Sequence, residues 1–100
     1  MPDQSIIDII REYFSTQPIL RAWIFGSYAR GEQTPDSDID ILVDFDHQNA
    51  RITLFTLVEI ADTLREKTSK EIDLVENGRL LPFAQRTADN DKLLIYERAN

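Results

Sequence analysis

The chain has 100 residues, of which 42% are hydrophobic, a size that suits one domain spanning residues 1–100 and leaves no room for a separate substrate-binding domain. Its formal net charge of −7 disfavours a nucleic-acid partner, because such binding depends on Lys and Arg residues that neutralise phosphates. The sequence has no apolar run near the ~20 residues that span a bilayer and no cationic start typical of a signal peptide, so we expect a cytoplasmic protein without a membrane contact.

The first third of the chain predicts a helix, a strand and a second, short helix. Apolar residues recur at helical spacing over residues 5–14, and Pro18 ends this helix because the residue before a proline leaves the helical region. Residues 20–25 are rich in branched and aromatic side chains, which predicts a buried strand that ends at Gly26. A short helix over residues 27–30 and a loop over residues 31–37 follow.

The strand predicted over residues 38–46 has one apolar face and one acidic face. Its odd positions are apolar, whereas its even positions are Asp38, Asp40, Leu42, Asp44 and Asp46. We interpret Asp44 and Asp46, toward the far end of the strand, as solvated residues.

The rest of the chain predicts two helices and two strands. An apolar stripe predicts a helix over residues 54–67 that packs on the core, with outer residues available to a partner helix. A strand over residues 71–75, a helix over residues 80–88 and a short edge strand over residues 93–96 follow. Helices and strands thus alternate, which predicts an α/β (α+β) fold with a small mixed sheet, helices mainly on one face, and the acidic face open to a ligand.

Three aspartates predict a metal site. Asp38 and Asp40 lie two apart on a strand, so their side chains leave one face with backbone positions roughly 6.5 Å apart. Two like charges this close favour a bound cation, and hard divalent cations prefer carboxylate oxygens. If the strand of Asp73 is a neighbour, all three carboxylates converge and can hold two Mg²⁺ ions, as in phosphoryl and nucleotidyl transfer. Taken singly, such aspartates are more often solvated or structural.

The turn before the predicted short helix suits a triphosphate. Gly26 lets the backbone approach a phosphate closely, while Ser27 adds a hydroxyl donor at a helix N-terminus. Arg30 is a candidate cation for the same phosphates, with a salt bridge to Glu32 or Asp36 as the alternative.

The aromatic residues and the one histidine give weaker signals. Tyr28 directly follows the turn and is a candidate for stacking on a nucleobase. Trp23 is a second candidate, although its place in an apolar strand is more typical of the core. His47 follows a strand in a polar loop, and we interpret it as a surface residue.

Together these residues resemble a known family. Gly26-Ser27, ten intervening residues and then Asp38-Ile39-Asp40 between apolar residues match the signature of the minimal nucleotidyltransferases (MNT) of the DNA polymerase β superfamily. The later Asp73 resembles the third carboxylate of that family. The resemblance implies a polymerase β-like fold, catalytic and metal-binding roles for the three aspartates and triphosphate binding by Gly26 and Ser27. Arg30 matches a family position whose role is less settled.

The resemblance also implies a partner. Family members of this size are similar to antitoxins of bacterial two-gene modules, whose partner is a helical HEPN-domain toxin with RNase activity. By that analogy the chain is a protein adenylyltransferase that uses Mg²⁺ and transfers AMP from ATP to a tyrosine hydroxyl of the toxin. The alternatives are a non-catalytic antitoxin that acts by binding alone, and nucleotidyl transfer to a small molecule or an RNA end.

Overall fold

Four strands form one mixed sheet, in the order β3-β2-β1-β4. The computed structural model describes residues 4–34, 36–79 and 82–99. Its elements in chain order are α1 (Gln4–Phe14), β1 (Ile19–Phe25), α2 (Gly26–Arg30), β2 (Ile39–Phe45), α3 (Leu54–Thr68), β3 (Ile72–Glu76), α4 (Pro82–Asp91) and β4 (Leu93–Glu97). Every predicted helix and strand is confirmed, to within a few residues at its ends. Residues 80 and 81, the start of the helix predicted over 80–88, lie outside the described residues.

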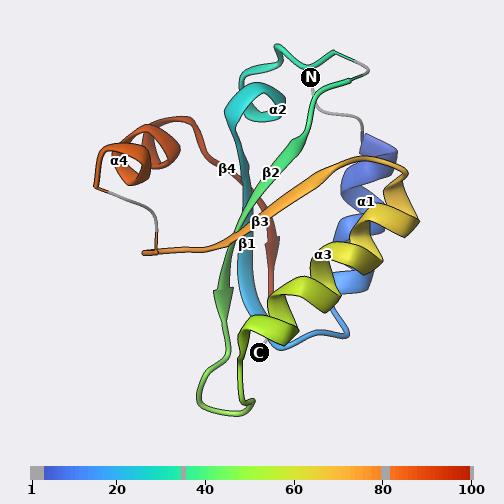
Figure 1. Ribbon diagram of the computed structural model, residues 1–100, viewed down its shortest axis with the longest axis vertical. Helices are drawn as coiled ribbons and strands as arrows, with labels where there is room; N and C mark the ends of the chain where they lie inside the picture. The colour runs from blue at the N-terminus through green and yellow to red at the C-terminus, as the bar shows by residue number, and fades with distance from the viewer. Residues whose placement is uncertain (1–3, 35, 80–81, 100) are drawn as a thin grey trace.

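The strand pairing explains the mixed character of the sheet. β1 pairs antiparallel with both β2 and β4, whereas β2 and β3 are parallel. A parallel pair needs a crossover connection, and α3 supplies it between β2 and β3. β4 lies at the edge of the sheet, as predicted (Figure 1).

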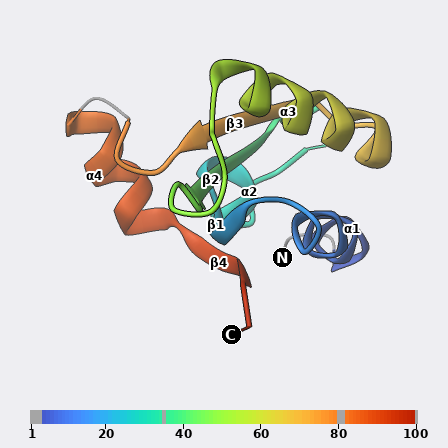
Figure 2. The same cartoon turned by 90° about the horizontal axis from the view of Figure 1, so that it is seen from below.

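The two longest helices, α1 and α3, lie on one side of the sheet, and α4 lies on the other (Figures 1 and 2). The core fills the space between the sheet and the two helices α1 and α3. All four odd-numbered residues of β2 are buried there, together with side chains from both helices, among them Ile10, Phe14, Ile60 and Leu64. Complete burial of such a side chain stabilises the fold by about 1.5–3 kcal/mol.

The acidic face of β2 is open only in part. Asp38 and Asp73 are exposed at the end of the sheet next to α2, whereas Leu42, farther along the same face, is buried. Ligand access to this face is therefore restricted to the end next to α2.

The interpretation of Asp46 as a solvated residue is wrong. Its side chain is only 6% exposed and accepts hydrogen bonds from Asn49 and from Arg98, whose Nη1 atom lies 2.7 Å from Oδ2. Asp44 is half-buried, and it too has partners: it forms an ion pair with Arg21 and accepts a hydrogen bond from Asn77. These far-end aspartates connect β2 to other parts of the fold, and the Arg98 partner lies 52 residues away, beyond what strand periodicity can indicate.

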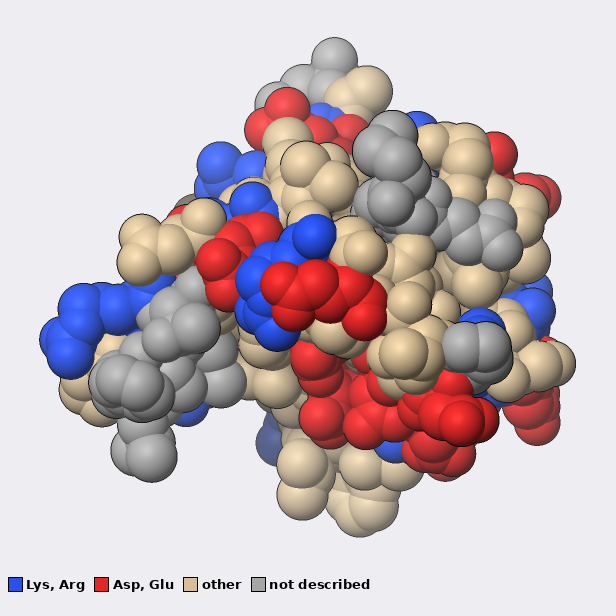
Figure 3. Space-filling model, turned by 90° about the horizontal axis from the view of Figure 1, so that it is seen from above, with Lys and Arg blue, Asp and Glu red and all other residues tan. Residues whose placement is uncertain are grey.

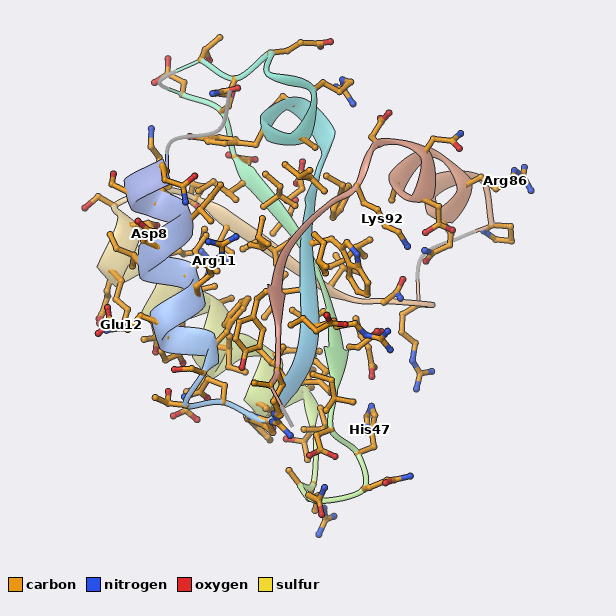
Figure 4. All side chains as sticks on the ribbon, turned by 180° about the vertical axis from the view of Figure 1, so that it is seen from behind. Asp8, Arg11, Glu12, His47, Arg86 and Lys92 are labelled. Atoms are coloured by element: carbon orange, nitrogen blue, oxygen red, sulfur yellow. The ribbon has the colours of Figure 1, made fainter. Side chains whose placement is uncertain are left out.

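Side chains also fix the sheet edge and the start of α3. Arg11 extends from α1 toward β4 and donates a hydrogen bond from Nε to the Ile95 carbonyl (Figure 4). The α3 N-terminus has a reciprocal cap in which the side chains of Thr53 and Thr56 each accept from the other's backbone N–H. No helix in the described ranges has the length and apolar character needed to cross a membrane.

Candidate active site

The sheet register brings Asp40 and Asp73 side by side. Asp40 pairs with Phe25 of β1 on one side and with Asp73 of β3 on the other. Neighbouring strands lie about 4.8 Å apart, and the two carboxyl groups are within hydrogen-bond reach of each other. The condition on which the predicted site depended, that the strand of Asp73 is a neighbour of β2, is therefore met.

Gly26 lies directly against Asp40. Its backbone has φ +71°, and a Cβ atom at this position would collide with Oδ2 of Asp40. Glycine is required here for two reasons, because other residues rarely adopt this φ and because no side chain fits. The turn predicted to bind phosphates is thus in contact with a central carboxylate of the site.

The electrostatics of Asp40 follow from this crowding. Burial, followed by the negative charges of Asp73 and Asp38, raises the pKa of Asp40 to about 6. The hydrogen bond with Asp73 acts in the same direction, whereas the positive charge of Arg30 opposes it. The carboxylates therefore favour a proton or a cation between them.

The donor set fits Mg²⁺. Asp38, Asp40 and Asp73 offer only carboxylate oxygens, which are the ligands that hard divalent cations prefer. Asp38 immediately precedes β2 and is close enough to act on the charge of Asp40. Within the described part of the chain, no group of three or more His, Cys, Asp or Glu side chains is arranged so that it could hold a metal ion as it stands. The structure thus joins Asp40 and Asp73 directly, with Asp38 beside them at the exposed rim.

The start of α2 has the features predicted for phosphate binding. Ser27 is half-buried in the first turn, and the preceding Phe25 has extended backbone and provides no side-chain cap. The first N–H groups of a helix have no partner within the helix, so they are available to an anion. The role of Ser27 stays a prediction.

Arg30 is held by two carboxylates. Its Nη1 atom lies 3.0 Å from Oδ2 of Asp91, and its Nε atom lies 3.3 Å from Oε2 of Glu32. The pair with Glu32 was one of the predicted alternatives. Asp91, on α4 and 61 residues away, has no local sequence signal that could have indicated it. Arg30 thus links α2 to α4 while its charge still acts on Asp40.

Tyr28 does not serve as a stacking platform, and that prediction is wrong. Its side chain is buried in the hydrophobic core, because the inner face of the short α2 helix packs there. Trp23 is half-buried, with the Lys92 ammonium 4.8 Å from its ring centre. His47 lies at the opposite end of the molecule from α2 (Figure 4). His47 is exposed, as predicted, and contacts Glu76.

The chain matches the family described as "Polymerase beta, Nucleotidyltransferase" over residues 5–100. It therefore belongs to the polymerase β nucleotidyltransferase family. A Methanocaldococcus jannaschii protein, provisionally named a protein adenylyltransferase, is 38% identical over 89 residues, which cover 88% of this chain and 83% of that protein. These matches place the chain among nucleotidyltransferase enzymes, as predicted.

Solved structures confirm the fold. A crystal structure of a toxin-antitoxin with AMP-PNP has a TM-score of 0.71 at 22% identity, covering 95% of this chain and 73% of that one. A structure of a tri-AMPylated Shewanella oneidensis HEPN toxin in complex with an MNT antitoxin has a TM-score of 0.63 at 19% identity, covering 95% of this chain and 69% of that one. At these identities the likeness establishes the polymerase β-like fold.

Proposed function

We propose that this chain transfers AMP from ATP to a tyrosine hydroxyl of a HEPN-domain toxin, with Mg²⁺ as cofactor, and thereby acts as the antitoxin. The observation that carries the proposal is the pairing of Asp40 with Asp73 against the Gly26 turn. Support also comes from the adenylyltransferase name of the archaeal relative and from the AMPylated HEPN toxin that accompanies one structural neighbour.

The Gly26 turn would bind the triphosphate of ATP. The backbone N–H groups that begin α2 and the Ser27 hydroxyl would donate hydrogen bonds to the β- and γ-phosphates. The missing side chain of Gly26 lets the Asp40 carboxylate lie directly against this turn. AMP-PNP, an ATP analogue, is present in one structural neighbour, which supports ATP as the nucleotide. Arg30, the last residue of α2, would add a positive charge whose field reaches Asp40.

The three aspartates would hold the metal and move the proton. Asp38, Asp40 and Asp73 would bind Mg²⁺, which when bound would neutralise phosphate charge and make a hydroxyl more acidic. Asp73 accepts the proton of the acceptor tyrosine. The tyrosine oxygen then forms a bond to the α-phosphorus, the bond from that phosphorus to the bridging oxygen breaks, and pyrophosphate leaves with the electron pair.

The test is intact-protein mass spectrometry of a HEPN-domain product encoded beside this chain, after incubation with the chain, Mg²⁺ and ATP. We expect a gain of one or more AMP units on tyrosine, which is lost with the Asp38→Ala, Asp40→Ala double variant. Circular dichroism of that variant controls for its fold. If the toxin gains no AMP, and the variant still binds and neutralises it, the chain is a non-catalytic antitoxin and the proposal fails.

A further inference from the structure

The first two turns of α3 expose three large apolar side chains. Phe55 is 85% exposed, Leu54 74% and Val58 50%, in contrast to Ile60 and Leu64 on the inner side of the same helix, which are fully buried. Phe55 and Val58 lie three residues apart and so share the outer face of α3. Exposed apolar groups that cluster in this way mark interaction surfaces more often than isolated ones do.

The outer face continues into an acidic half. Glu59, Asp62 and Glu66 line, together with Phe55 and Val58, a shallow surface cavity of about 370 Å³. Asp62 pairs with Arg65 at 2.6 Å, whereas Glu59 and Glu66 form no ion pair with any described residue. Figure 3 shows Asp and Glu side chains gathered in the lower part of the view, with few Lys or Arg side chains among them.

A second hollow lies on the other side of the apolar residues. It has a volume of about 390 Å³ and apolar walls from Leu54, Leu57, Leu74 and Val75. Leu54 and Phe55 thus form a ridge between two hollows. We name the ridge and the acidic half of the outer face, residues 54, 55, 58, 59, 62 and 66, the α3 outer surface.

We infer that the α3 outer surface is the docking site for an amphipathic helix of the protein partner, with large apolar side chains over the ridge and Lys or Arg over Glu59 and Glu66. The inference rests on the proposed function only in so far as that function requires a protein partner. α3 has 15 residues, about 22 Å of helix, and so can match a partner helix of similar length.

Charge selects the occupant. In a chain of net charge −7, two carboxylates without an ion pair favour a basic partner segment. A second copy of the chain fits poorly. Parallel α3 helices would bring Glu59 and Glu66 against the same residues of the other copy. Fully overlapping antiparallel helices would bring Phe55 against the charged side chains of Lys67 and Glu66.

The position of the surface suits the proposed reaction. α3 is followed directly by β3, on which Asp73 is the second residue, so the acidic half of the surface lies toward the candidate active site along the chain (Figure 1). A partner that extends along α3 from the ridge toward Glu66 would therefore approach the end of the helix that leads into β3.

The experiment measures binding of two probes by fluorescence anisotropy: the HEPN-domain product, and a synthetic 15-residue helix of Leu and Lys at amphipathic spacing. We expect Phe55→Ser, Val58→Ser to weaken both at least tenfold, and Glu59→Gln, Glu66→Gln to weaken both and reduce their salt dependence. Leu93→Ser, Leu94→Ser is the matched control, because these side chains are also exposed, at 46% each, but lie on β4 and not on the α3 outer surface. A peptide with Glu in place of Lys should not bind.

Three results would overturn the inference: unchanged affinity of the Phe55→Ser, Val58→Ser variant, equal loss in the β4 control, or a dimer of the isolated chain that this variant dissociates. Thermal melts confirm that the variants are folded. AMP transfer measured in parallel separates the two proposals. If AMP is transferred to a toxin whose binding does not depend on α3, only the docking inference fails. If the α3 variants lose binding but the unmodified chain transfers no AMP, only the proposed reaction fails.

Discussion

The Oδ2 atom of Asp40 occupies the space that a side chain on Gly26 would need. Gly26→Ala should therefore displace the Asp40 carboxylate and strain a backbone with φ +71°, and we expect it to lower the free energy of unfolding by about 1–3 kcal/mol and to abolish AMP transfer. Gly78→Ala is the matched control, since Gly78 has φ +90° but open space around its Cα. Chemical denaturation and transfer assays compare the two. Equal loss of transfer in both variants would show that backbone strain alone is responsible.

The raised pKa of Asp40 predicts an unusual pH dependence for the metal-free protein. Because the folded state holds this proton more tightly than the unfolded state, with a pKa of about 6 against 3.8, the stabilising contribution of Asp40 is present below pH 3.8 and is lost as the pH rises toward 6. Mg²⁺ should lower this pKa by binding the ionised form. Carboxyl ¹³C NMR titration with and without Mg²⁺ measures it. A pKa near 4 in the metal-free protein would contradict the prediction.

Asp73→Asn should separate nucleotide binding from chemistry. The amide cannot accept the tyrosine proton, so we expect kcat to fall by about 10²–10⁴ while ATP binding is kept. Glu71→Gln, exposed immediately before β3, is the control and should leave kcat unchanged. Single-turnover transfer and equilibrium ATP binding give the two readouts. Normal turnover in the Asn variant would remove the proton-accepting role.

Arg30 tests whether a structural ion pair also serves the nucleotide. Arg30→Ala should raise the KM for ATP about tenfold, with kcat changed little, because it removes a charge-assisted contact to phosphate. Asp91→Asn breaks only the link to α4 and should leave the charge of Arg30 in place. If both variants lower the melting temperature and neither changes KM, Arg30 connects α2 to α4 and does nothing more.

Asp46 should matter for stability and not for catalysis. Hydrogen bonds from Asn49 and Arg98 hold its pKa below the ordinary value, so its contribution is present above pH 3.8 and is lost as the pH falls through the lowered pKa. Asp46→Asn should lower the melting temperature at pH 7 and reduce the loss of stability on acidification. Glu12→Gln, exposed on α1, should do neither. Transfer activity measured below the melting range should be equal in both.

Local pattern was sufficient to predict most of the fold and part of the site. Alternation along β2 correctly assigned its apolar positions to the core, and the Gly-Ser and Asp-x-Asp spacing identified the family. The side-by-side position of Asp40 and Asp73 depended on strand order, which local sequence does not encode. Tyr28 was misassigned because five helical residues are too few to show which face is buried.

The error at Asp46 and the partner of Arg30 that was not predicted share one physical cause. Arg98 binds Asp46 across 52 residues and Asp91 binds Arg30 across 61, and neither pair leaves a trace in local spacing. Alternating polarity in a strand predicts that a charged residue is solvated, although a partner distant in the sequence can bury it in the folded chain. Such long-range partners decide whether a carboxylate is structural, and only the tertiary fold reveals them.

The parallel pairing of β3 with β2 sets the order in which the site can form during synthesis. Gly26 directly follows β1, the antiparallel neighbour of β2, so it can meet Asp40 early. Asp73 reaches Asp40 only after α3 has crossed the sheet and β3 has been added at its edge. A nascent chain that ends within α3 would carry the phosphate turn without the third carboxylate. The candidate active site is thus completed only by the second half of the chain, and a fragment released before β3 would lack Asp73, the proposed proton acceptor.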